Sequence, residues 1–239
     1  MRTSLIGLSA ALFAVATPAA AAIDLGNGIS ATGGATAVSD YRFRGVSLTD
    51  KDPAAQGTLT LSHESGLYAG TWVSNLQDTA TYGDAEVDLY IGYGREIAPG
   101  TTFDINSTFF IYADSDNGTD SDYMEVGTSL KHDFGVAAVK VGANWAPSRK
   151  ATGNEDLIYT YGEVSAPVPT TPFTLRGRFG VQDLGFTSYN EWQIGAETTL
   201  GPVSASLSYV DTDISKTDVL SGLYSNAKAG VVLSLGVAF

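Results

Sequence analysis

The carboxyl-terminal segment, residues 231–239, alternates between large apolar residues and residues that are mostly small. Successive side chains of a β-strand point to opposite faces, so this period of two predicts a strand with one continuous apolar face. The apolar set is Val231, Leu233, Leu235, Val237 and Phe239. A strand with this pattern needs an apolar environment on one side only.

The amino terminus has the organisation of a secretory signal peptide. Arg2 supplies a basic start, residues 5–16 are apolar, and Ala20-Ala21-Ala22 form a small-residue cleavage site. We therefore expect residues 1–22 to be a cleaved signal peptide and residues 23–239 to form one domain. An uncleaved anchor is the less favoured alternative, because the apolar run is short and rich in alanine.

The rest of the sequence predicts a membrane protein that crosses with strands. After residue 22 no segment reaches the roughly 20 apolar residues that a membrane-spanning helix needs. Without such helices, only a closed barrel satisfies its backbone hydrogen bonds in hydrocarbon. A strand that ends the chain on an aromatic residue is typical of bacterial outer-membrane barrels, where it carries the assembly signal; here that residue is Phe239.

The predicted fold class is an all-β, antiparallel, up-and-down transmembrane barrel of about twelve strands. Short turns, such as Ala98-Pro99-Gly100, alternate with longer and mostly acidic loops, such as residues 113–121. This alternation is typical of barrels with both termini on the periplasmic side. The strands are expected near residues 29–44, 55–64, 67–75, 84–97, 101–112, 122–132, 136–146, 155–166, 173–181, 189–200, 203–212 and 227–239.

The net charge of −13 argues against nucleic-acid binding, which requires clusters of Lys and Arg. Acidic loops at the cell surface could instead hold divalent cations beside lipopolysaccharide phosphates, although simple solvation of the loops is the favoured explanation. We expect outer-membrane lipid, lipopolysaccharide, the barrel-assembly machinery and small hydrophilic solutes as partners. The expected location is the cell outer membrane, reached through the periplasm.

Charged residues on the strands are expected to face the lumen, because a charge on the lipid face costs about 2–4 kcal/mol at the bilayer midplane. Opposed charges across a pore select which solutes pass, but they could also form salt bridges that close a narrow barrel. Segments 67–75 and 155–166 carry aromatic residues on both faces, so their orientation stays open. The candidate pore-lining residues are Arg42, Arg44, Glu86, Asp88, Asp104, Glu125, Lys140, Arg176, Arg178, Glu191 and Glu197.

Two of these candidates have alternative roles. Arg176 and Arg178 lie one strand period apart and could together grip a carboxylate or phosphate. Equally, they could pair with Glu191 or Glu197 on the next antiparallel strand, and we favour this pairing.

Sites for metals, cofactors or catalysis are not predicted. Residues 114–125 match a calcium loop imperfectly, so a solvated acidic loop is favoured over weak divalent binding. His63 and His132 have no accompanying ligands in register, and Ser62 and His63 point to opposite faces of a strand. We therefore expect no enzyme activity and no cofactor. The weak divalent candidates are Asp114, Asp116, Asp120 and Asp122.

Three segments are similar to a known family. Residues 39–47 with 52–54, residues 66–75 and residues 86–93 resemble the TorF-type porins, proteobacterial proteins that are also grouped as the Gcw_chp family. The resemblance implies an outer-membrane location and carries no catalytic residue or solute. The function expected is passive, electrostatically filtered diffusion of small hydrophilic solutes through a porin-like channel. The alternative is a non-conducting structural or adhesive barrel that presents acidic surface loops.

Overall fold

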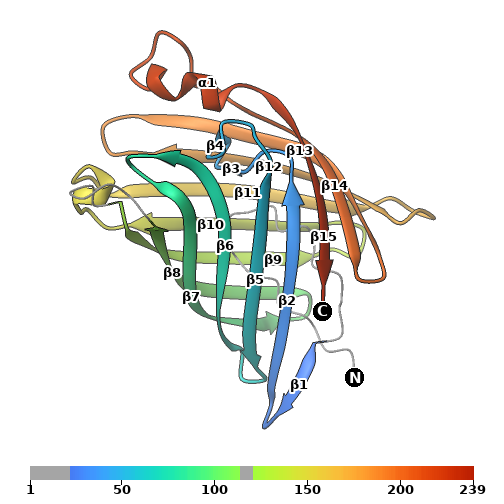
Figure 1. The fold of residues 1–239 in the computed structure, drawn as a ribbon. Helices are drawn as coiled ribbons and strands as arrows, with labels where there is room; N and C mark the ends of the chain where they lie inside the picture. The colour runs from blue at the N-terminus through green and yellow to red at the C-terminus, as the bar shows by residue number, and fades with distance from the viewer. Residues whose placement is uncertain (1–21, 114–120) are drawn as a thin grey trace.

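The computed structural model describes residues 22–113 and 121–239, in which twelve long antiparallel strands form a closed barrel (Figure 1). Each strand pairs with its neighbours in chain order. The strands are β2 (Ile29–Val38), β5 (Ala54–His63), β6 (Leu67–Thr79), β7 (Gly83–Ala98), β8 (Thr101–Ala113), β9 (Tyr123–Asp133), β10 (Ala138–Ala146), β11 (Leu157–Pro167), β12 (Phe173–Asp183), β13 (Ser188–Leu200), β14 (Val203–Thr212) and β15 (Gly230–Ala238).

The barrel closes where β2 pairs with β15 on one edge and with β5 on the other. The β2–β15 register runs from Val38 opposite Ser234 to Gly34 opposite Ala238. Beyond it, Gly33 and Phe239 exchange backbone hydrogen bonds of 3.1 and 2.9 Å. A further short strand that was not predicted, β1 (Ile23–Gly26), pairs with the next part of the same β2 edge. The pairing along this edge of β2, where the barrel closes, therefore continues past the end of β15.

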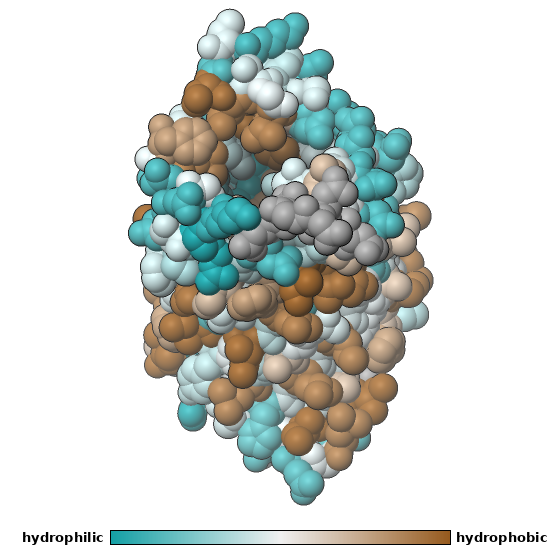
Figure 2. All heavy atoms as spheres, turned by 60° about the vertical axis from the view of Figure 1, so that its left-hand side comes forward, coloured by the Kyte–Doolittle hydropathy of each residue, from teal (hydrophilic) through white to brown (hydrophobic). Residues whose placement is uncertain are grey.

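The outer face of the wall is apolar and the inner face is mainly polar, as the alternation predicts. On β15, Leu235 is 53% exposed, whereas Ser234 is 9% exposed and faces the interior. Figure 2 shows hydrophobic residues spread over the middle and lower part of one side, with hydrophilic residues gathered toward the upper end. The strand faces that the sequence left open are settled by Tyr68 and Trp72 on β6 and by Tyr159 and Tyr161 on β11, which are all buried.

Tyrosines on the inner face of the wall pack over glycines of the adjacent strands. A Cβ added to these glycines would collide with the tyrosine ring, so only glycine leaves the ring room to lie against the wall. Rings that cover a strand glycine restore the packing that the missing side chain removes. The pairs are Tyr90 over Gly70, Tyr68 over Gly92, Tyr161 over Gly142 and Tyr159 over Gly180.

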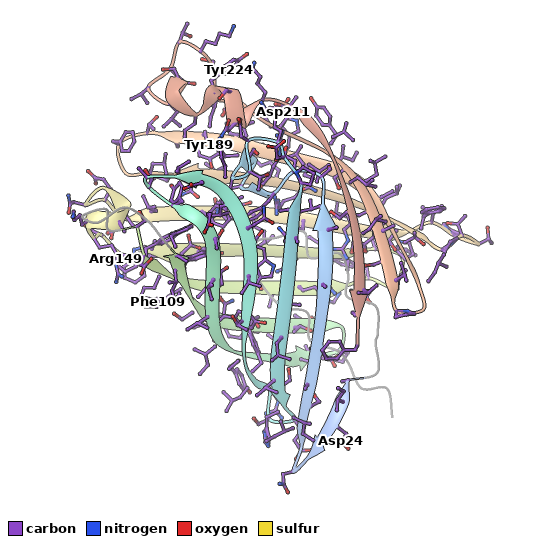
Figure 3. All side chains as sticks on the ribbon, viewed as in Figure 1. Asp24, Phe109, Arg149, Tyr189, Asp211 and Tyr224 are labelled. Carbon is purple, nitrogen blue, oxygen red and sulfur yellow. The ribbon has the colours of Figure 1, made fainter. Side chains whose placement is uncertain are left out.

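The two ends of the barrel differ. The carboxyl terminus and β1 lie at the lower end in Figure 1, and the short helix α1 (Tyr224–Ala227) lies at the upper end. Asp24 and Tyr224 mark these two ends in Figure 3. A second short helix, η1 (Lys150–Thr152), lies in the β10–β11 loop. No helix in the described ranges is long and apolar enough to cross a membrane.

The prediction of one strand over residues 29–44 is wrong beyond residue 38. After Val38 the chain leaves the wall and makes a separate two-stranded hairpin, β3 (Arg42–Phe43) with β4 (Val46–Ser47). Positive φ angles of 49° at Arg44 and 85° at Gly45 turn the chain back between these two strands. The other predicted strand ends differ from the observed ones by a few residues only.

Candidate functional site

The hairpin between β2 and β5, residues 39–53, folds into the barrel, and we call it the lumen hairpin. Its stem is held by a backbone hydrogen bond from Leu48 N to Tyr41 O of 2.8 Å. A second bond of 3.1 Å runs from Tyr41 N to the hydroxyl of Thr49. Tyr41, Arg44 and Ser47 are each 2% exposed. The hairpin is therefore enclosed by the wall rather than extended into solvent.

Arg44, at the tip of the lumen hairpin, binds two wall strands. Its Nη2 donates to Glu125 Oε2 on β9 at 2.5 Å, and its Nη1 donates to Gln182 Oε1 on β12 at 2.6 Å. The guanidinium also lies 4.3 Å from the ring centroid of Tyr159, in cation–π geometry. Burial alone would lower the pKa of Arg44, but the Glu125 carboxylate, together with smaller contributions from Tyr123 and Tyr159, outweighs burial and raises the pKa. Arg44 therefore stays charged and fixed.

Other bonds tie the lumen hairpin to more of the wall. The Tyr41 hydroxyl donates to Glu86 Oε2 on β7 at 3.0 Å, and burial followed by the Glu86 charge raises the Tyr41 pKa. The Tyr189 hydroxyl on β13 donates to the Arg44 carbonyl at 3.2 Å. The backbone N–H of Gln77 on β6 donates to the Leu48 carbonyl at 2.9 Å. Because these partners come from β6, β7, β9, β12 and β13, the hairpin spans the lumen and narrows it.

The loop between β14 and β15, residues 213–229, covers the lumen hairpin from the upper end. It contains η2 (Ser221–Leu223) and α1. Asn226 Nδ2 donates to the Ser47 carbonyl at 3.3 Å, and Arg42 Nη1 donates to the Lys228 carbonyl at 2.7 Å. An apolar cluster joins the two segments to β13 and consists of Val46, Tyr189, Ile214, Leu220 and Ala227. The two loops thus pack as one unit at this end of the barrel.

The structure places most of the predicted lining residues in the interior. Those that are at most 8% exposed are Arg44, Glu86, Asp88, Asp104, Glu125, Arg178, Glu191 and Glu197. Lys140 is half-buried, with Nζ 5.4 Å from the Tyr161 ring centroid. Arg42 and Arg44 lie in the interior because the lumen hairpin carries them there. The prediction that they lie on a wall strand is therefore wrong.

The arginines of β12 pair with glutamates of β13, which confirms the favoured interpretation of Arg176 and Arg178. Arg178 Nε lies 2.9 Å from Glu191 Oε1, and Arg176 Nη2 lies 2.7 Å from Glu197 Oε1. The Tyr159 hydroxyl also donates to Glu191 Oε1 at 2.6 Å. These contacts neutralise much of the positive charge that a double-arginine anion grip would need.

Glu86 and Asp88 have no basic partner within the described ranges. They lie two residues apart on the inner face of β7 and are 1% and 4% exposed. Neither forms a salt bridge with a described residue, and no described donor reaches Glu86 Oε1 or Asp88 Oδ1. This part of the inner wall therefore carries two adjacent carboxyl groups without a counter-charge in the described ranges.

Of the four weak divalent candidates in the acidic loop, only Asp122 lies in the described ranges. Asp114, Asp116 and Asp120 lie outside the described residues. Asp122 Oδ1 accepts a hydrogen bond of 2.9 Å from the backbone N–H of Tyr112, so this carboxylate joins the ends of β8 and β9.

At the other end of the barrel, Phe239 is 53% exposed and its ring covers Gly33.

Sequence reasoning missed the wall residues that hold the lumen hairpin, chiefly Gln182 and Tyr189. The alternation places Tyr189 at the start of one predicted strand and Gln182 just after the end of another, and it does not mark their partners. The one local signal was Arg44-Gly45, because a glycine directly after a strand pattern often marks a turn.

A family comparison identifies the chain. The model of a family described as bacterial proteins of unknown function, Gcw_chp, matches residues 23–239. The chain belongs to the Gcw_chp family. This assignment agrees with the resemblance seen in the first third of the sequence. No curated protein is significantly similar to the chain in sequence.

Solved structures share the fold of this Gcw_chp protein. The KdgM porin superposes with a TM-score of 0.58 at 5% sequence identity, covering 87% of this chain and 98% of that chain. The same values hold for the KdgM porin in complex with disordered oligogalacturonate. The NanC porin gives a TM-score of 0.53 at 11% identity, with the same coverage of both chains. At these identities the similarity concerns the barrel fold.

Proposed function

We propose that this Gcw_chp protein is a porin-like channel of the outer membrane that lets small hydrophilic solutes diffuse passively. The observation that carries the proposal is a closed barrel with an apolar outer face, a charged inner face and a lumen hairpin bonded to both sides of the interior. Such a hairpin reduces the bore, so the channel would pass only small solutes. No catalytic step is part of the proposal.

The outer surface supports a membrane location. Large apolar residues on the outer face include Leu89, Ile91, Ile194 and Leu235, which are each at least half exposed. An exposed apolar face of this size requires lipid around it. Export of residues 23–239 after signal-peptide cleavage, assembly through the terminal Phe239, and contact with lipopolysaccharide belong to the same proposal.

The shared fold adds support, because KdgM and NanC are both named porins and one KdgM structure contains oligogalacturonate. The solute of the present protein is not given by that likeness. The TorF-type label agrees with a porin and stays a prediction.

Interior charge would filter the solutes. In the described part of the chain four arginines are matched by carboxylates, in the pairs Arg42–Asp40, Arg44–Glu125, Arg176–Glu197 and Arg178–Glu191. The neighbouring carboxyl groups of Glu86 and Asp88 are buried and share a proton, so at neutral pH this pair supplies at most one negative charge without a counter-charge in the described ranges. We expect the channel to favour cations and neutral solutes over anions.

Single-channel recording in planar lipid bilayers tests the proposal. Wild-type protein should give stable conductance steps. A variant in which Asn-Gly replaces residues 42–47 keeps the Tyr41–Leu48 backbone bond as a tight hairpin and removes the tip. Its conductance should be larger than that of the wild type, because the tip no longer fills the lumen.

Silence of both proteins would contradict the proposal and favour the structural or adhesive barrel. Conductance that appears only after the hairpin is shortened would also count against free diffusion, because the native hairpin would then be a plug. Correct folding of both samples is checked by the shift in gel mobility on heating that folded barrels show.

A further inference from the structure

A small cavity lies between the stem of the lumen hairpin and the barrel wall. Its volume is about 50 Å³, and it is partly open. Because one water needs about 10–15 Å³ in this measure, the cavity has room for roughly three to five waters. Its apolar lining is formed by Val38, Val210 and Val232, and its polar lining includes Gln56 and Gln193.

The side-chain amides of the two glutamines form no hydrogen bond with the described parts of the chain, although both backbones pair within the sheet. Gln193, on β13, is 8% exposed, and Gln56, on β5, is half-buried. By contrast, Gln182 on the same inner wall binds Arg44. Because the cavity is partly open, water reaches these amides, and a guest that supplies both donors and acceptors can take the place of that water.

The charges at the cavity are balanced. Arg42 Nε lies 2.6 Å from Asp40 Oδ2, and Arg178 Nε lies 2.9 Å from Glu191 Oε1. A guest therefore meets no net positive charge that would recognise an anion. It meets amide oxygens and N–H groups, which hydroxyl groups satisfy by donating and accepting at once.

We propose that this cavity is a binding site for a small neutral polyhydroxylated solute, or for one hydroxyl-bearing edge of a sugar. The inference rests on the proposed function, because it names the solute class that would pause beside the lumen hairpin. The valines of β2, β14 and β15 form the apolar side, which suits the C–H groups of a polyol. Gln56 and Gln193 form the polar side.

The chain contains four glutamines, Gln56, Gln77, Gln182 and Gln193, so labelling with side-chain ¹⁵N-glutamine gives four amide signals. The protein is folded in detergent micelles and titrated with glucose, and the signals are assigned through single Gln→Asn variants. We expect the signals of Gln56 and Gln193 to shift progressively. Those of Gln77 and Gln182 should stay in place as internal controls. Gluconate at the same concentrations should cause smaller shifts.

A matched pair on β15 localises the binding. Val232→Phe fills the cavity from the inner face, whereas Val231→Phe adds the same ring to the outer face, where Val231 is 64% exposed. The glucose shifts should be lost in Val232→Phe and kept in Val231→Phe.

Four results would overturn the inference: no shift in the wild type, equal shifts of all four signals, shifts that survive Val232→Phe, or larger shifts with gluconate than with glucose. This measurement needs no membrane. If glucose does not bind but the protein conducts normally in bilayers, only the proposed binding site is refuted. If glucose binds but the protein never conducts, the proposed channel function is refuted and the binding site remains supported.

Discussion

Arg44 and Glu125, which are 81 residues apart in the chain, form an ion pair of 2.5 Å inside the barrel. Both side chains are 3% exposed. Arg44 lies on the lumen hairpin and Glu125 on β9, so one contact fixes the hairpin tip to the wall. Removal of either partner leaves a buried charge without compensation, so both the hairpin and the wall depend on this contact.

Arg44→Ala should loosen the lumen hairpin and raise the single-channel conductance. It should also lower the free energy of unfolding by about 3–5 kcal/mol, because the buried Glu125 carboxylate loses its counter-charge. Bilayer recording and urea unfolding in lipid vesicles measure the two effects. Arg95→Ala, at an exposed position of β7, is the control and should change neither quantity. Unchanged conductance in Arg44→Ala would show that the hairpin does not set the bore.

The double variant Glu86→Gln with Asp88→Asn should reduce the preference of the channel for K⁺ over Cl⁻, because it removes the charge of two adjacent carboxyl groups that have no basic partner in the described ranges, whichever of them holds a proton. The free energy of unfolding should not fall, since an amide oxygen at position 86 can still accept the Tyr41 hydroxyl and no buried charge is left unpaired. The reversal potential in a KCl gradient measures the preference. Asp84→Asn, at an exposed position of the same strand, should leave the reversal potential closer to that of the wild type.

Glu191→Gln should destabilise the barrel more than Glu197→Gln does. Glu191 is fully buried and binds both Arg178 and Tyr159, whereas Glu197 pairs with Arg176, whose side chain is 27% exposed. The expected loss is about 3–5 kcal/mol for the buried pair and near 1 kcal/mol for the more exposed pair. Equal losses in urea unfolding would contradict the assigned difference in solvation.

Gly142→Ala should destabilise the barrel by about 1–3 kcal/mol through overpacking. A Cβ at this position would lie 2.6 Å from Cζ of Tyr161, whose ring covers the glycine. Gly162→Ala is the matched control, because nothing lies within 4 Å of a Cβ there. Thermal unfolding of both variants, compared with the wild type, measures the difference; two equal midpoints would argue against tyrosine–glycine packing as a source of stability.

The wall could be predicted because its pattern is local. Alternation along a strand follows from the geometry of the backbone, and lipid outside forces charges such as Asp104 and Glu197 inward. The pairing of Arg176 and Arg178 with β13 could be predicted too, since neighbouring strands bring such side chains together. These conclusions need no knowledge of contacts across the lumen.

The lumen hairpin could not be predicted in this way. Residues 39–44 continue the strand alternation in sequence, and a strand that runs to residue 44 with Arg42 and Arg44 inward would turn Tyr41 to the outer face. Its true position depends on Glu86, and that of Arg44 depends on Glu125 and Gln182, which are distant in the chain. The same holds for the cavity, because its lining comes from six wall strands and the lumen hairpin, which only the closed barrel brings together.

The departure of the chain from the wall at Val38 and its return at Ala54 leave these two residues paired across adjacent strands. The hairpin is consequently an insert between wall strands that would be neighbours without it. Its length and composition can change while every register of the sheet is kept. Relatives could thus acquire different permeability by exchanging a single segment, with no strand added to or removed from the cylinder.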